Sequence, residues 1–418
     1  MRISKEELDQ RRKQAGIPGL SVRYVDLRHP ERSSHIEQGV SDVKSTAQVT
    51  EKTRFGAASL SKPVAALIFL KALSKGLFRT EDEANITDPK ILLQKGLDRP
   101  LYEIADFGPE HIRQDPRYKL LTARILLSHK SGFPIKGDPA DLYFMFNPGD
   151  GYGYSGFGYV FLQEIFKEKT GKSFEDLAQE LFHDPECLMP NSTFVPVQQP
   201  VCAANSLFTT TEDYTRFITY WMSEDQKIFH EAFINQVDMT KIRWDEWPKG
   251  ERLPDEILEK VGWGLGWGLQ LSTEGAEPKV TRLYHSGDMN QWRAWAVVNV
   301  EDKTMVVYFA NSPEGHRLAD YIVSSTVGLD DGLEFFFGTY AFQREVQPVA
   351  NAPPMMRDQY SGTGKQPFFS QPRPSATAAE PPQKPSDEKK REREDKPDEK
   401  MGVETQDPDP RVTKKSSK

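Results

Sequence analysis

The spacing of hydrophobic and polar residues divides the first 330 residues into three parts. Residues 20–27 and 35–40 have the pattern of short strands, and strand-like segments return between residues 262 and 311 as GWGLQL, KVTRLYH, RAWAVVNV and TMVVYFAN. From about residue 80 to residue 220 the signals are mostly helical. Strands at both ends with helices between them predict one sheet built from both ends of residues 15–330.

A turn at residues 56–59 leads into a predicted buried helix. Within residues 62–73 the apolar positions recur at helical spacing, at Val64, Leu67, Ile68 and Ala72. A closing helix is predicted over residues 319–327. The longest uninterrupted apolar run, residues 63–70, is far shorter than the roughly 18 residues that a membrane span requires, so no membrane-spanning segment is expected.

The balance of charged residues argues against some classes of binding partner. The 418 residues include 54 Lys and Arg against 62 Asp and Glu, a net charge of −8. This leaves no broad basic field, so neither nucleic acid nor an anionic membrane surface is an expected partner. Residues 1–14 are charged where a secretory signal would be apolar, and Ser4 with Glu7 predicts a capping box that opens a short helix. A cytoplasmic location is expected, with non-classical export left open.

Cysteine and histidine positions predict neither a disulfide framework nor a metal site. Cys187 and Cys202 are too few for a framework and are expected to be reduced thiols. His183 lies four residues before Cys187, but no second pair follows to complete a metal site.

Composition changes sharply near Pro348. Residues 348–418 contain 12 of the 30 prolines, no tryptophan and the charge run DEKKREREDKPDEK. We predict a folded domain over residues 1–347, with its helical region at about 80–220, followed by a disordered tail. The tail is either a solvated spacer or a segment for export or for docking on a protein partner.

Ser59 and Lys62 are the first candidates for chemistry. Residues three apart on a helix share a face, and an adjacent amine can take the proton of a serine hydroxyl as it attacks a carbonyl. The same spacing at residues 41–44 and 386–389 lies in polar segments, whereas Ser59 precedes an apolar helix. Burial there would lower the pKa of the lysine. Taken alone, the pair is better explained by a helix-capping serine and a lysine that extends its amine to solvent.

Two later motifs change that balance. Tyr154-Ser155-Gly156 lies in the glycine-rich PGDGYGYSGFGY, and His285-Ser286-Gly287 lies between strand-like segments. In this order, the three motifs resemble the serine β-lactamase and penicillin-binding-protein superfamily, most closely its class C and D-alanyl-D-alanine carboxypeptidase branch, which includes many esterases. GIPGLSV, LLSHKSGF, SLFTTTEDYTRF and GWGLGWG extend the similarity over about residues 15–330.

The resemblance implies an α/β (α+β) fold of β-lactamase/transpeptidase type, with an antiparallel sheet flanked by helices and a helical region beside it. It also implies that Ser59 is the nucleophile, Lys62 its proton acceptor and Tyr154 the acid/base that protonates the leaving group. The oxyanion hole would be formed by the backbone N–H groups of Ser59 and Asp288. A small-molecule or peptide-like acyl substrate and no cofactor or metal are expected.

The resemblance further implies that four residues line the substrate side of the site, namely Gly156, His285, Ser286 and Gly287. Two of them depart from the penicillin-recognising pattern, because Gly156 replaces an asparagine and His285 a lysine. A histidine titrating near pH 6.5 would hold a substrate carboxylate less firmly than lysine does. This favours an esterase-like serine hydrolase. A D-alanyl-D-alanine carboxypeptidase or β-lactamase, and a silent scaffold acting through its tail, remain the alternatives.

Other readings of these segments are weaker. Gly151, Gly153 and Gly156 spell a dinucleotide-binding pattern, but residues 147–150 separate them from the preceding apolar run, so the tight strand-to-helix turn is missing. His129, within LLSHKSGF, is interpreted as a hydrogen-bonded scaffold residue. Four tryptophans near the third motif suit either an apolar acyl pocket or the core: Trp263, Trp267, Trp292 and Trp295.

Overall fold

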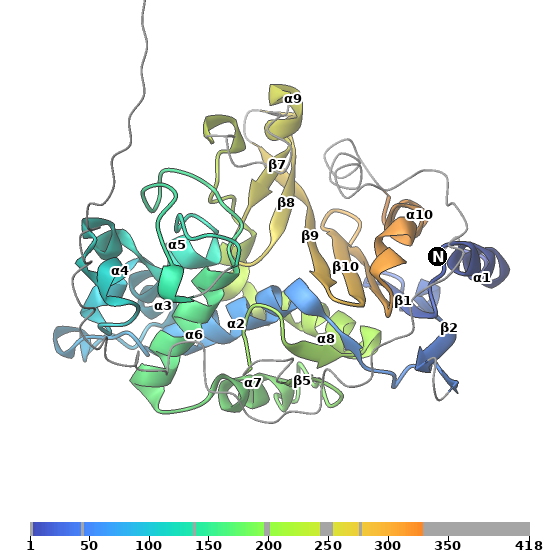
Figure 1. Cartoon of the computed structure of the whole chain (residues 1–418), viewed down its shortest axis with the longest axis horizontal. Coiled ribbons are helices and arrows are strands. Elements are labelled where there is room, and N and C mark those ends of the chain that lie inside the picture. Colours follow the sequence, from blue (N-terminus) through green and yellow to red (C-terminus); the bar gives the residue numbers. More distant parts are fainter. Residues whose placement is uncertain are drawn as a thin grey trace, which may run out of the picture. The chain divides into compact units, whose positions relative to one another are not determined.

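An eight-stranded antiparallel sheet, in the order β3-β2-β1-β11-β10-β9-β8-β7, organises the fold (Figure 1). This computed structural model describes residues 3–42, 46–136, 139–195, 201–242, 254–275 and 278–328. The strands of the sheet are β1 (Gly19–Asp26), β2 (Ser34–Asp42), β3 (Ala47–Gln48), β7 (Val261–Trp263), β8 (Gly268–Ser272), β9 (Lys279–Met289), β10 (Trp292–Asn299) and β11 (Thr304–Ala310).

The sheet joins the two ends of the described chain, as the strand pattern predicts. The first strand pairs with the last, in a register that sets Val22 opposite Tyr308. β11 also pairs with β10, and β10 pairs with β9. The third motif therefore enters the middle of a continuous sheet. It lies inside β9 rather than at the end of a strand.

Alternating residues of the central strands supply two separate cores. Along β11, Val306 and Tyr308 face a cluster that includes residues of the first and last helices, whereas Val307 and Phe309 face the larger core. This alternation follows from the two-residue repeat of a strand. Both faces of the central strands are therefore buried.

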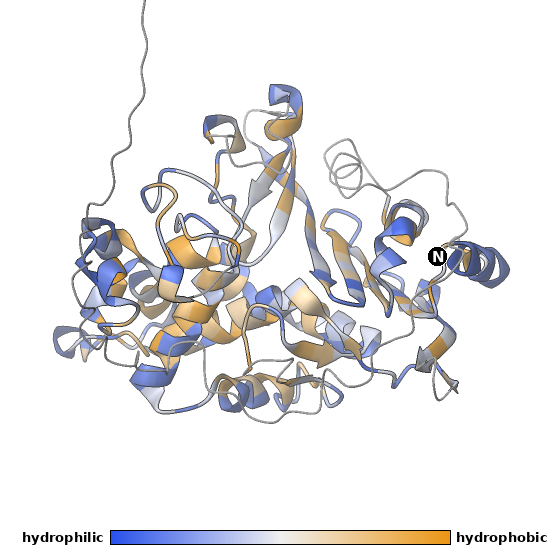
Figure 2. Cartoon of the chain, viewed as in Figure 1, coloured by the Kyte–Doolittle hydropathy of each residue, from blue (hydrophilic) through white to orange (hydrophobic). Residues whose placement is uncertain are grey.

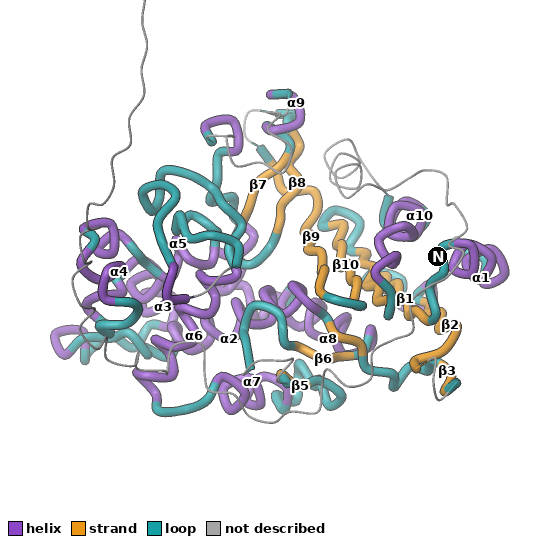
Figure 3. Tube along the Cα trace, in the orientation of Figure 1, coloured by secondary structure: helices purple, strands orange, loops and turns teal. Residues whose placement is uncertain are grey.

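Helices cover both faces and form the region beside the sheet. One group of helices lies on the far side of α2 from the strands (Figure 3). Their bounds are α1 (Lys5–Gln14), α2 (Ser61–Ser74), α3 (Pro89–Asp98), α4 (Glu110–Gln114), α5 (Ala123–Leu127), α6 (Gly156–Thr170), α7 (Phe174–Phe182), α8 (Thr211–Trp221), α9 (Asp255–Leu258) and α10 (Ala319–Ser324).

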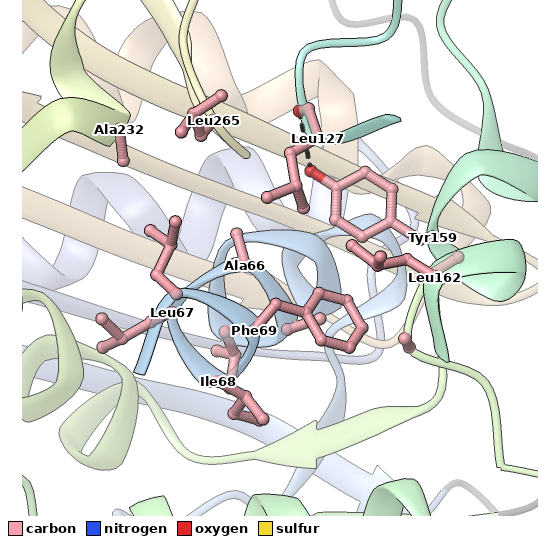
Figure 4. Packing of buried hydrophobic residues seen from close by; sticks show 14 of the residues in the cluster. Ala66, Leu67, Ile68, Phe69, Leu127, Tyr159, Leu162, Ala232 and Leu265 are labelled. Carbon is pink, nitrogen blue, oxygen red and sulfur yellow. Dashed lines mark hydrogen bonds between the residues drawn. The ribbon is translucent and has the colours of Figure 1, made fainter. Parts of the chain in front are cut away.

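Burial differs sharply between the first two helices. α1 is mostly hydrophilic (Figure 2), and Leu8 is its only buried residue. Ser4 accepts a hydrogen bond from the N–H of Glu7, but the Glu7 carboxylate binds Arg11 instead of completing a capping box. α2 is buried almost all round and packs on Leu127, Tyr159 and neighbouring side chains (Figure 4).

A small second sheet, in the order β4-β6-β5, leads into α2. β4 (Phe55–Gly56) pairs with β6 (Leu207–Thr209), and β6 pairs with β5 (Thr193–Phe194). The N–H of Ala57 then donates to the carbonyl of Leu207, 2.8 Å away. The segment around residue 207 thus lies beside the turn that precedes α2.

Four further predictions can be compared with the described residues. The closing helix ends at Ser324, three residues before the predicted end. Cys187 and Cys202 are free and buried. The described helices include none that is long and apolar enough to cross a membrane. The tail predicted to be disordered, residues 348–418, lies outside the described residues.

Candidate active site

Ser59 lies in a short 3-10 turn, Ala58–Leu60, immediately before α2. Hydrogen bonds fix the turn on both sides: the Ser61 hydroxyl donates to the carbonyl of Ala58 at 2.6 Å, and the Tyr214 hydroxyl donates to that of Leu60 at 2.8 Å. Ala58 has a φ of 49°, an unusual left-handed conformation for a residue with a side chain. The half-buried Ser59 is therefore held on a rigid, strained turn.

Lys62 places its amine against this serine. Its Nζ lies 3.1 Å from Ser59 Oγ and donates to the carbonyl oxygen of Ala204 at 2.9 Å. The side chain is only 2% exposed, and burial lowers its pKa to about 7. A large fraction of Lys62 is therefore neutral at pH 7 and can accept a proton.

Tyr154 comes from the glycine-rich loop before α6. The centre of its ring lies 4.9 Å from Lys62 Nζ and 4.3 Å from the centre of the His129 ring. Hydrogen bonds hold the loop on either side of the tyrosine, from the N–H of Gly153 to the carbonyl of His129 and from the N–H of Ser155 to His129 Nδ1. The phenol ring, amine and serine hydroxyl thus form one cluster.

The third motif brings the backbone of β9 to the serine turn. A β-carbon added at Gly287 would lie 2.4 Å from the carbonyl oxygen of Ala57 and 3.3 Å from the β-carbon of Ala58. No side chain fits this contact. Gly287 is therefore required for the close approach of strand and turn.

His285 is buried on the same strand, with its ring centre 6.0 Å from that of Tyr154. Its Nδ1 lies 2.7 Å from the carbonyl oxygen of Ser286. A carbonyl only accepts, so Nδ1 carries the proton and the neutral ring has its lone pair on Nε2. Among the described residues, Nε2 has no hydrogen-bond partner.

The expectation that His285 titrates near pH 6.5 is wrong. Burial, and secondarily the charge of Lys62, lower its pKa to about 3. The residue is therefore neutral at neutral pH and offers no positive charge to a substrate carboxylate. Sequence alone does not reveal this, because the burial comes from tertiary packing around β9.

Asp288 and Gly156 lie at the margins of the cluster. The half-exposed Asp288 carboxylate lies 3.1 Å from Arg293 Nη1 and 3.5 Å from His316 Nε2. Burial raises the pKa of Asp288, but the hydrogen bond of His316 and the charge of Arg293 outweigh it, so the net shift is downward. Gly156 begins α6, and its N–H donates to the carbonyl of Ile135. The oxyanion-hole and substrate-binding roles stay predictions.

Aromatic side chains divide between the site and the core. Trp263 lies beside the cluster, with ring centres 5.7 Å from Tyr154 and 5.5 Å from His285. By contrast, Trp267 and Trp295 are fully buried core residues. Trp292 is also buried and packs against Phe55 and Phe208. The packing interpretation therefore holds for these three, and among the four tryptophans Trp263 is the one beside the cluster.

Two groups near Lys62 were not predicted from the sequence. One is the carbonyl of Ala204, which leaves no signal in the identity of the side chain. The other is Tyr159, whose ring centre lies 5.7 Å from Lys62 Nζ and whose hydroxyl donates to the carbonyl of Leu127. Its place in the aromatic segment GYGYSGFGY is the only available hint.

The described residues contain no group of three or more His, Cys, Asp and Glu arranged to hold a metal ion. The first two glycines of the dinucleotide-like pattern, Gly151 and Gly153, lie in the loop before α6 and pack against Phe146. The cluster can support proton transfer, because the Ser59 hydroxyl meets an amine with a pKa of about 7 next to a phenol ring.

Several solved structures share the fold of this chain. A penicillin-binding protein homologue from Pyrococcus abyssi, described as octameric, is 17% identical over 77% of this chain and 76% of its own, with a TM-score of 0.56. A penicillin-binding protein from Bacillus halodurans is 15% identical over 74% of this chain and 96% of its own, with a TM-score of 0.55. A class C β-lactamase is 15% identical over 78% and 96%, with a TM-score of 0.55.

The TM-scores establish a common fold, the β-lactamase/transpeptidase fold predicted above. No curated protein sequence matches the chain. The sequence model of the Beta-lactamase family matches residues 5–323, which include all three motifs and the whole sheet. The chain therefore belongs to the Beta-lactamase family, whose fold and serine-hydrolase character it shares.

Proposed function

We propose that this protein is a serine esterase that hydrolyses a small acyl ester through a covalent intermediate on Ser59. The observation that carries the proposal is the 3.1 Å contact between Ser59 Oγ and Lys62 Nζ, on a lysine whose pKa burial lowers to about 7. Such an amine is a base matched to neutral pH.

The reaction has two halves. In acylation, Lys62 takes the proton of Ser59 while Oγ bonds to the carbonyl carbon, and Tyr154 gives a proton to the departing alkoxide. In deacylation, water attacks the acyl carbon and gives a proton to the Tyr154 phenolate. The bond between the acyl carbon and Oγ then breaks, Lys62 returns its proton to Oγ, and the acid and the free serine are released. The N–H groups of Ser59 and Asp288 would stabilise the oxyanion in both halves.

Ester substrates without a carboxylate suit this site best. His285 is neutral and Gly156 has no side chain, so neither position offers the cation or amide that penicillin-recognising relatives use. The neighbouring wall, Trp263, is aromatic and suits an apolar acyl group. Amide hydrolysis by the same route is chemically allowed but requires stronger protonation of the leaving group.

The second candidate is cleavage of a β-lactam or a D-alanyl-D-alanine peptide. It is favoured by the structural similarity to penicillin-binding proteins and a class C β-lactamase. At 15% identity this similarity concerns the fold, so it ranks below the chemistry of the site. A third candidate, a silent scaffold, is disfavoured because Ser59, Lys62 and Tyr154 all have reactive side chains.

Two chromogenic substrates separate these candidates. We expect the full-length protein to hydrolyse p-nitrophenyl butyrate, with Ser59→Ala losing at least about 1,000-fold in kcat/KM and nitrocefin turned over far more slowly. Brisk nitrocefin cleavage without esterase activity would favour the second candidate. No Ser59-dependent turnover of either substrate would favour the scaffold.

A further inference from the structure

His129 contacts the tyrosine loop through both its backbone and its side chain. It lies just beyond α5 and is completely buried. Its carbonyl accepts from the N–H of Gly153 at 2.9 Å, and its Nδ1 accepts from the N–H of Ser155 at 3.0 Å. One residue thus binds the chain directly before and directly after Tyr154.

These contacts determine the protonation state of the imidazole. Because Nδ1 accepts a hydrogen bond, the proton of the neutral ring is on Nε2. Burial is the main reason that the pKa of His129 lies well below its usual value, and the charge of Lys62 adds to the effect. An imidazolium would also lose the acceptor that holds Ser155. The ring therefore acts as a neutral hydrogen-bond acceptor at working pH.

The imidazole also supports the phenol ring directly. The two ring centres are 4.3 Å apart with an interplanar angle of 36°. On its other sides the imidazole lies against Trp263 and Tyr159, at 5.1 Å and 5.5 Å between ring centres. His129 is therefore fixed by its own surroundings and cannot swing away from Tyr154 without disturbing the core.

The backbone of His129 is in an uncommon conformation. Its φ is 58°, in the left-handed region that glycine and asparagine adopt more easily than most residues. Such a conformation persists where the surrounding contacts hold it in place. The hydrogen bond to Ser155 and the ring contact with Tyr154 are among those contacts.

We propose that His129 is a positioning residue that holds the Tyr154 hydroxyl in the geometry for protonating the leaving group. This inference rests on the proposed esterase function. It implies that the loss of kcat/KM on substitution of His129 increases with the basicity of the leaving group. An alkoxide needs one, whereas p-nitrophenolate departs without one.

Two substitutions separate the hydrogen bond from the backbone conformation. His129→Asn keeps an acceptor near the position of Nδ1, and His129→Gly removes it, while both residues tolerate a positive φ. We expect His129→Gly to lower kcat/KM for ethyl butyrate by about 100-fold but for p-nitrophenyl butyrate by less than about fivefold. His129→Asn should stay within about fivefold of the unmodified protein with both esters.

A double-mutant cycle tests whether the effect passes through Tyr154. In a Tyr154→Phe background, we expect His129→Gly to change the ethyl ester rate by less than about twofold, because the hydroxyl it positions is gone. Equal losses with both esters, or independent effects in the cycle, would overturn the proposal. If His129→Gly does not fold, His129→Ala takes its place: a loss confined to the ethyl ester supports the role, and an equal loss with both esters contradicts it.

Failure of the proposed function has a different signature. It would appear in the unmodified protein as the absence of turnover that depends on Ser59, and it would overturn the positioning role as well. If turnover depends on Ser59 but His129→Gly does not discriminate between leaving groups, the esterase function stands and the positioning role alone is overturned.

Discussion

At the scale of single residues, the chemistry depends on what burial does to Lys62. Only the neutral amine has a lone pair for the proton of Ser59, and burial lowers its pKa to about 7. We therefore expect kcat/KM to rise with pH through an apparent pKa near 7 and to level off above it. The measurement is a pH profile with p-nitrophenyl butyrate. A profile that stays low until pH 10 would show that Lys62 remains charged.

Restoring a cation at His285 should change the choice of substrate. We expect His285→Lys to raise the rate with an ester that bears a carboxylate, relative to its neutral analogue, by about tenfold, because a lysine supplies the missing positive charge. Competing the two esters in one assay measures this ratio. His285→Gln, which stays neutral, is the matched control. An unchanged ratio in His285→Lys would place the carboxylate elsewhere.

Contacts between single residues could be predicted where sequence spacing determines them. Ser59 and Lys62 meet because three residues separate them at the start of a helix. The ionisation of His285 could not be predicted, because it depends on burial by distant segments. The contact of Lys62 with the carbonyl of Ala204 could not be predicted either, because every residue has a backbone carbonyl.

At the scale of elements, the site exists because β9 lies directly against the serine turn. An alanine at Gly287 would clash with the carbonyl of Ala57. We expect Gly287→Ala to lower the free energy of unfolding by about 1–3 kcal/mol and kcat/KM by about 100-fold, since strand and turn must separate. Thermal unfolding and ester kinetics measure both effects.

A substitution elsewhere on β9 serves as the control for Gly287→Ala. Lys279→Ala changes the exposed start of β9 and should alter neither stability nor rate appreciably. If Gly287→Ala were as harmless as the control, the strand and the turn would not be in the close contact described above.

Long elements were predicted well, and short ones were not. The strand-like segments RAWAVVNV and TMVVYFAN and the helix over residues 62–73 lie within one or two residues of β10, β11 and α2. The strands of the small sheet are two or three residues long, too short for any repeat to show. Tertiary pairing beside the serine turn, rather than local pattern, creates them.

At the scale of the whole molecule, the sheet and all three motifs lie within the region matched by the Beta-lactamase family, residues 5–323. We therefore expect deletion of residues 348–418 to leave kcat/KM for p-nitrophenyl butyrate within about twofold. A loss of more than about tenfold would show that the tail contributes to the site. Normal activity with loss of a bound protein would instead identify the tail as a docking segment.

The overall architecture could be predicted because strand patterns occur at both ends of the domain and three motifs occur in a fixed order. The convergence of those motifs could not be measured from sequence, since it depends on pairings such as that of Val22 with Tyr308 across the sheet. Substrate choice was less predictable still, because it depends on the charge state of buried groups.

The most direct test of the central claim is covalent labelling of the full-length protein with a fluorophosphonate, followed by mass spectrometry of its peptides. We expect one adduct, on Ser59, that is absent in Ser59→Ala and forms at least about 100-fold more slowly in Lys62→Met. An adduct on another residue, no adduct at all, or undiminished labelling of Lys62→Met would contradict a Ser59 nucleophile activated by Lys62.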